Sequence, residues 1–98
     1  MEEKNQASAI DAIVRRHPRL KSAIWKKPGS ELASPQGLSG GERALYEVCV
    51  SIWNGDAKVN LYELMNELGD EDFKNVVEGL LVARFGPAGA AKFQLSYT

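Results

Sequence analysis

The sequence predicts an all-α fold, a small helical bundle within a single domain. Between residues 42 and 86, apolar side chains recur at spacings of three and four residues in three successive stretches, the pattern of helices that bury one face. A residue suited to capping a helix precedes each stretch, and a glycine follows it. The chain has 98 residues, of which 44% are hydrophobic, and that is enough for one core.

Two short helices are expected in a basic N-terminal segment, residues 1–27. Apolar residues at helical spacing predict the first helix over about residues 8–16. His17-Pro18 then interrupts the pattern, because a residue before proline is disfavoured in the α region. Pro18 suits the first turn of a second helix, where its missing N–H is not needed, and this helix is expected to continue to Lys26.

The three-helix unit, residues 42–86, is expected after a loop over 28–41 that is rich in Gly, Pro and Ser. Its apolar stripes are Leu45, Val48, Cys49, Ile52 and Trp53, then Leu61, Leu64, Met65 and Leu68, then Phe73, Val76, Val77, Leu80 and Leu81. Because such stripes can bury one another, we expect these three helices to form the core. The tail, residues 87–98, alternates apolar and polar side chains near its end, which predicts a short C-terminal strand.

The string LSGGERAL, residues 38–45, resembles the signature loop of ABC-type ATPases. The resemblance implies a helix N-terminus that donates N–H groups to a nucleotide, and over residues 38–98 it implies a decayed fragment or mimic of such a subunit. The chain lacks the GxxxxGK[ST] string that cradles phosphates, and Tyr62 stands where the family has a magnesium-binding aspartate. Ser39 and Glu42 also match a capping box, and we therefore interpret the string as a helix start.

The segment VNLYELMNELGDEDFKNVVEGLLVARFG, residues 59–86, resembles the helix-turn-helix of winged-helix regulators. The resemblance implies that the third helix enters the DNA major groove through its N-terminal residues. Here those residues include Asp70, Glu71 and Asp72, with Asp70 as the expected N-cap. Because carboxylates repel phosphates, the pattern favours a helix-turn-helix-like architecture over DNA reading by this helix.

Charge is divided between the two halves of the chain. Residues 1–41 hold seven Lys/Arg against four Asp/Glu, and residues 42–98 hold five against nine. The candidate basic face for a partner consists of Arg15, Arg16, Arg19, Lys21, Trp25, Lys26 and Lys27. Such a face fits an acidic protein or a nucleic-acid backbone, or it packs on the acidic half of its own chain. The acidic corner Asp70, Glu71 and Asp72 is the candidate contact for an electropositive partner.

The residue types and their spacing do not indicate a catalytic site. The one histidine, His17, precedes a proline at a helix junction, and the one cysteine, Cys49, lies on an apolar stripe as a small buried hydrophobe. No residue pattern indicates a metal site or a cofactor. Trp53 is expected in the core, whereas Trp25 is expected to be an exposed contact.

These observations predict a non-enzymatic regulatory, adaptor or inhibitory protein that binds another protein. The alternative is a nucleic-acid-binding protein that uses residues 15–27. The sequence contains no apolar run long enough for a membrane span and no secretory signal pattern, and a single cysteine is typical of a cytoplasmic protein.

Overall fold

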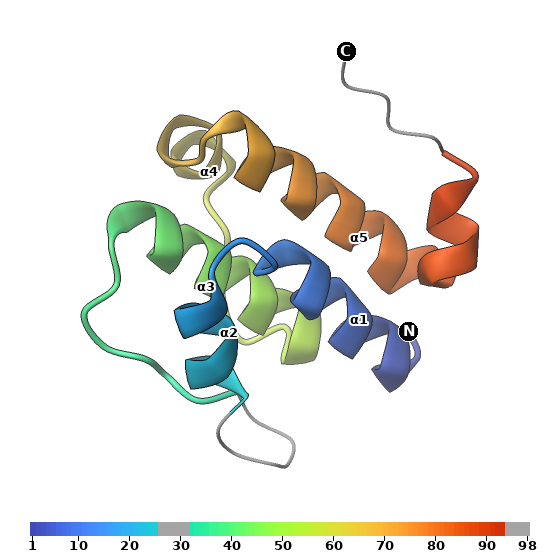
Figure 1. The fold of residues 1–98 in the computed structure, drawn as a ribbon, viewed down its shortest axis with the longest axis horizontal. Coiled ribbons are helices and arrows are strands. Elements are labelled where there is room, and N and C mark those ends of the chain that lie inside the picture. The colour runs from blue at the N-terminus through green and yellow to red at the C-terminus, as the bar shows by residue number, and fades with distance from the viewer. Residues whose placement is uncertain (26–31, 94–98) are drawn as a thin grey trace.

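Five helices account for most of the residues that the structure, a computed structural model, describes, namely 1–25 and 32–93 (Figure 1). They are α1 (Glu3–Ile13), α2 (Pro18–Ile24), α3 (Gly40–Asn54), α4 (Leu61–Glu67) and α5 (Asp70–Ala91). The described ranges contain no strand, and the predicted all-α bundle is confirmed. The predicted C-terminal strand falls mainly on residues 94–98, which lie outside those ranges.

The core is built around α1, α3 and α5. Helix α1 lies along α5 and also packs on α3, so that α1 sits between the other elements as in Figure 1. The buried core side chains are Ala9, Ile10, Ile13, Val14, Leu20, Ile24, Leu45, Val48, Cys49, Ile52, Leu64, Val76, Val82 and Ala83. The core is therefore not confined to residues 42–86, because the N-terminal helices supply several of its fully buried members.

A glycine allows α1 and α5 to approach closely. Gly79 is buried in α5, and a Cβ atom built on it would overlap Ile13 and lie 3.1 Å from the carbonyl oxygen of Ala9. The absence of a side chain at this position lets the two helices pack at a distance that alanine would not permit. This contact explains why α1, rather than α4, is the principal neighbour of α5.

Helix α2 is held through its apolar side and through a tryptophan at its end. Leu20 and Ile24 are buried, and Trp25 follows as the C-cap residue. The Trp25 indole N–H donates to Asp11 Oδ1 at 2.9 Å, and its ring meets that of Trp53 edge-on at 5.7 Å between centroids. Trp53 is half-buried beside the core rather than fully inside it.

Of the five helices described, α3 and α4 begin with a side-chain cap. Ser39 Oγ accepts from the Glu42 N–H at 3.2 Å and Glu42 accepts from the Ser39 N–H at 3.1 Å, which confirms the capping box. Asn60 Oδ1 accepts from the Glu63 N–H at 3.2 Å. The expectation that Asp70 caps α5 is wrong, because the chain is extended at Gly69 and Asp70 already lies in the first turn.

Helix boundaries differ from the expected ones at both ends of the chain. Helix α1 begins at Glu3 and ends at Ile13, so it overlaps the predicted span of about residues 8–16 but begins and ends several residues earlier. Gly86, at φ 78°, interrupts α5 where its end was predicted, but helical turns resume from Pro87. Proline needs no N–H partner in a first turn, so residues 87–91 are helical and not part of an irregular tail.

Candidate protein-binding site

Arg15, Arg16 and Lys21, three of the four cations of the predicted basic face that the structure describes, form ion pairs with carboxylates of the same chain. Arg15 Nη2 lies 2.9 Å from Glu78 Oε2, and Lys21 Nζ lies 3.9 Å from Asp11 Oδ1. Arg19 is exposed and forms no ion pair with a residue that the structure describes. Lys26 and Lys27 lie outside the described residues.

The acidic corner is divided by a contact with the N-terminal segment. Both carboxylate oxygens of Asp72 lie within 3.0 Å of His17 Nε2, and Arg16 Nη1 is 3.8 Å from the same carboxylate. Asp72 therefore joins α5 to the junction between α1 and α2. Asp70 and Glu71 remain exposed, and neither forms an ion pair within the described ranges.

Trp25 is less accessible than the sequence suggested. Its side chain is half-buried, its indole N–H is committed to Asp11, and its ring is in contact with Trp53. These contacts hold α2 in place. Because of these contacts, little of the Trp25 ring is accessible to a partner, although the flanking lysines in the sequence predicted an exposed ring.

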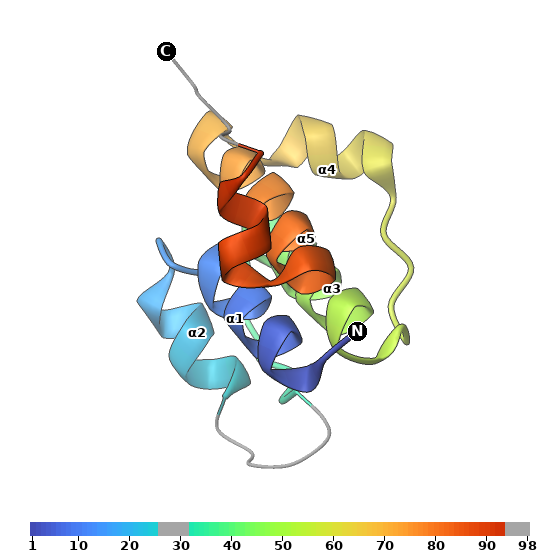
Figure 2. The same cartoon turned by 90° about the vertical axis from the view of Figure 1, so that its right-hand side faces the viewer.

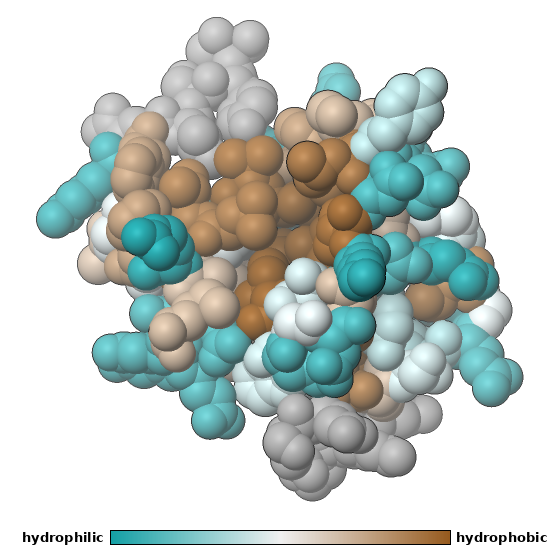
Figure 3. All heavy atoms as spheres, turned by 180° about the vertical axis from the view of Figure 1, so that it is seen from behind, coloured by the Kyte–Doolittle hydropathy of each residue, from teal (hydrophilic) through white to brown (hydrophobic). Residues whose placement is uncertain are grey.

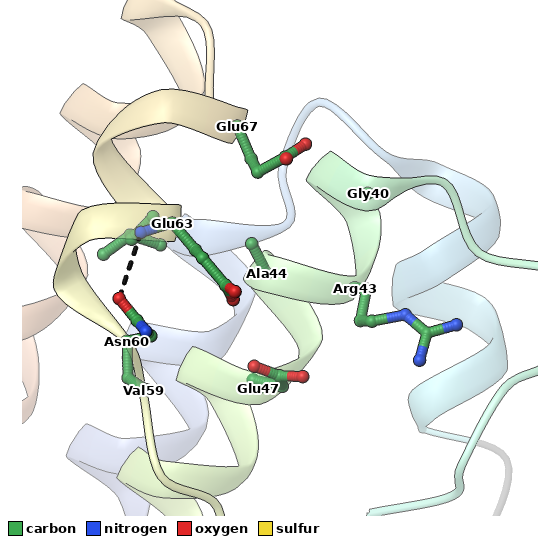
Figure 4. A pocket seen from close by; sticks show the side chains of 9 residues that line it. Gly40, Arg43, Ala44, Glu47, Val59, Asn60, Glu63 and Glu67 are labelled. Atoms are coloured by element: carbon green, nitrogen blue, oxygen red, sulfur yellow. Dashed lines mark hydrogen bonds between the residues drawn. The ribbon is translucent and has the colours of Figure 1, made fainter.

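A groove between α3 and α4 is lined by both charged and apolar residues (Figure 4). Its volume is about 180 Å³. The lining residues are Gly40, Arg43, Ala44, Glu47, Val59, Asn60, Glu63, Leu64 and Glu67. We call this feature the acidic groove.

Three glutamates give the acidic groove its charge. In Figure 4, Glu63 and Glu67 point from α4 toward α3, which contributes Glu47, while Arg43 points away from them. None of the three carboxylates forms an ion pair with a described residue. Like charges so placed produce a negative potential that a cation entering the groove would relieve.

The local sequence explains why these glutamates meet. Asn60 caps α4, and Glu63 and Glu67 follow one turn apart, so they lie on one face of that helix. Gly40 leaves room for Glu67, since a Cβ atom on Gly40 would lie 2.6 Å from Glu67 Oε2. Sequence reasoning missed the groove because Glu47 belongs to another helix and only tertiary packing brings it near.

The same geometry bears on the resemblance to ATPase signature loops. Gly40 and Gly41 form the first turn of α3, and the carboxylate of Glu67 lies against Gly40. A phosphate approaching this helix N-terminus would meet a carboxylate of its own charge. The capping box and this carboxylate both favour the interpretation of LSGGE as a structural helix start.

The single cysteine has the environment of a core residue. Cys49 is buried in α3, and burial raises the pKa of its thiol to about 12. A thiol with such a pKa holds its proton at neutral pH and is a weak nucleophile. Among the residues that the structure describes, no three His, Cys, Asp or Glu side chains are placed to hold a metal ion.

No helix within the described ranges is both long and apolar enough to cross a bilayer. Comparisons with protein-family models, with curated proteins and with solved structures find no match to this chain.

Proposed function

We propose that the protein is a small non-enzymatic regulatory, adaptor or inhibitory protein that acts by binding another protein at the acidic groove. The observation that carries the proposal is the set of three glutamates, Glu47, Glu63 and Glu67, which line the groove and form no ion pair with a described residue, while the Arg43 side chain points away from them (Figure 4). A partner that presents lysine or arginine would supply the missing charge.

The floor of the acidic groove supports a basic side chain as the occupant. Ala44, Val59 and Leu64 line it together with the carboxylates. Lysine and arginine carry long aliphatic stems that pack on apolar surface while the charged head remains at the polar rim. A guanidinium group can also engage two carboxylates at once, which favours arginine when the groove binds a single side chain.

The exposed remainder of the acidic corner adds negative charge to the same half of the chain. Asp70 and Glu71 are exposed in the first turn of α5, which begins shortly after α4 ends at Glu67. Complementary charge of this kind raises the association rate of a basic partner and makes that rate depend on salt.

The test compares neutralised variants in binding to a helical peptide that carries arginine and lysine on one face. Glu63→Gln with Glu67→Gln should weaken binding by about tenfold or more, because the variant removes charge from the groove while its shape is kept. Asp56→Asn with Glu2→Gln changes charge equally at exposed positions outside the groove and serves as the control. Equal weakening by both variants, or tight binding of a matched glutamine-bearing peptide, would contradict the proposal.

The alternative function is nucleic-acid binding by the basic segment, residues 15–27, and it can be tested with the same protein. The ion pairs of Arg15 and Lys21 with Glu78 and Asp11 would have to be exchanged for phosphate contacts. If this face binds nucleic acid, affinity for duplex or single-stranded DNA should fall steeply with salt and should be lost in Arg15→Glu with Lys21→Glu. Absence of binding at low salt would remove this alternative.

A further inference from the structure

A second pocket lies along α5, beside the junction formed by residues 14–17 between α1 and α2. Its volume is about 400 Å³, a size typical of small-molecule sites. Figure 2 shows this junction on one side of α5 and α4 on the other, and the pocket shares no lining residue with the acidic groove. It also differs from the continuous apolar area that Figure 3 shows, because its lining carries charges of both signs. We call this feature the mixed-charge pocket.

Charged side chains from α5 and from the junction line the mixed-charge pocket. They are Glu71, Lys74 and Glu78 on α5, and Arg15 and Arg16 in the junction. Arg15 and Glu78 satisfy each other, since their charged groups lie 2.9 Å apart. Arg16 lies 3.8 Å from Asp72 Oδ1, which is too far for a hydrogen bond, and Glu71 is exposed without an ion pair to a described residue. One guanidinium and one carboxylate can therefore engage a ligand without breaking a close ion pair of the chain.

Asn75 supplies a buried amide at the same place. It is 4% exposed and is the one buried polar residue among those that the structure describes. It lines the mixed-charge pocket, and its side chain forms no hydrogen bond with a described residue. Within the described ranges no enclosed side-chain nitrogen or oxygen lacks a partner, so the unpaired amide of Asn75 opens onto the pocket. A buried amide without partners is unfavourable, and a ligand that pairs with it removes that cost.

Helical spacing places Glu71 beside this amide. Glu71 and Asn75 are four residues apart, so their side chains are neighbours on one face of α5. Arg16 belongs to another wall of the pocket, because it comes from the junction. A carboxylate only accepts hydrogen bonds, a guanidinium only donates them, and an amide does both. These three groups together are suited to a ligand that carries a cation and an anion close to each other.

Ligands of a single charge fit this set less well. A simple anion would pair with Arg16 but would be repelled by Glu71, and a simple cation would have the opposite difficulty. In a zwitterion, the ammonium group donates to Glu71 and the carboxylate accepts from Arg16, while the Asn75 amide accepts from the first and donates to the second. Ala90 and Ala91 add a small apolar part to the lining, which suits a short aliphatic side chain.

We infer that the mixed-charge pocket binds a free α-amino acid with a small apolar side chain, and L-valine is the probe that tests it. The inference does not rest on the function proposed for the acidic groove. Titration of isotopically labelled protein with L-valine, followed by NMR, should shift the side-chain amide resonance of Asn75 at millimolar ligand. Valinamide lacks the carboxylate and N-acetylvaline lacks the ammonium group, so each should bind more weakly by a factor of about ten or more.

Single substitutions separate the two charges of the ligand. Glu71→Gln should weaken binding of L-valine by about tenfold without weakening that of N-acetylvaline, whereas Arg16→Gln should weaken both. Glu3→Gln and Arg19→Gln change the same groups at exposed positions outside the pocket and serve as controls. Asn75→Leu should abolish binding while the thermal stability of the ligand-free protein is retained, because leucine has nearly the same size and needs no hydrogen-bond partner.

Absence of binding at millimolar L-valine overturns the inference. Equal binding of L-valine, N-acetylvaline and inorganic phosphate also overturns it, because the pocket would then be a site for anions. The same conclusion follows if the controls weaken binding as much as Glu71→Gln and Arg16→Gln do. None of these results affects the acidic groove, because binding of the basic peptide there is measured separately.

Discussion

The close approach of α1 and α5 makes Gly79→Ala an informative substitution. A new Cβ atom would lie 2.6 Å from Ile13 Cδ1 and 3.1 Å from the Ala9 carbonyl oxygen. The Ile13 side chain can rotate to relieve the first contact. The second involves backbone, so the two helices must move apart.

Two effects of opposite sign determine how much Gly79→Ala changes the free energy of unfolding. Alanine in a helix interior is more favourable than glycine by about 0.5–1 kcal/mol. Overpacking a well-filled core costs about 1–3 kcal/mol. Because backbone cannot yield as a side chain does, we expect the cost to exceed the gain and the free energy of unfolding of Gly79→Ala to fall by about 1–2 kcal/mol, which lowers Tm by roughly 4–8 °C per kcal/mol in a chain of this length.

Urea unfolding followed by circular dichroism measures this change. Gly41→Ala is the matched control, because its Cβ atom would lie at an ordinary 3.5 Å from the Glu67 carbonyl oxygen, so this variant should gain stability. In an Ile13→Ala background, Gly79→Ala should cost less, since part of the space is vacated. If Gly79→Ala were as stable as Gly41→Ala, the proposed close packing of α1 on α5 would be refuted.

Three further variants address the cap, the thiol and the indole. Ser39→Ala should lower the free energy of unfolding by about 1 kcal/mol, because the cap is lost. Urea titration measures this free energy, and an unchanged value would show that the cap does not stabilise the helix. For Cys49, the pKa is raised from its ordinary 9.0 to about 12, so the unfolded chain loses the thiol proton first. The stability advantage over Cys49→Ala should therefore be complete below pH 9 and should decline by about 1.4 kcal/mol per pH unit above it. Parallel pH curves for the two proteins would show that the thiol titrates alike in both states. Trp25→Phe should cost about 0.5–1.5 kcal/mol by removing the N–H donor to Asp11, and an unchanged melting temperature would argue against that bond.

The helix starts could be predicted from sequence because a cap is a local interaction. Ser39 and Glu42 are three residues apart, and their reciprocal hydrogen bonds need no other part of the chain. Asp70 was misassigned because Gly69 satisfies the same extended geometry one residue earlier. Local patterns define such a boundary only to within a residue or two.

Which apolar stripe is buried depends on tertiary packing and could not be predicted. Leu61 and Met65 have the same helical spacing as buried residues, yet α4 turns them outward and buries only Leu64. Gly79 gave no sign in the sequence that α1 would be the neighbour of α5. The acidic groove was missed for a similar reason, since its glutamates lie on two helices that only the fold brings together.

The edge-on contact between Trp25 and Trp53 gives the molecule an intrinsic optical probe. These are the two tryptophans of the chain, so ultraviolet emission comes chiefly from one place, where α2 meets α3. Any ligand that loosens α2 would change the wavelength and intensity of that light. Binding at the acidic groove can thus be separated from rearrangement near the N-terminus without attaching a dye.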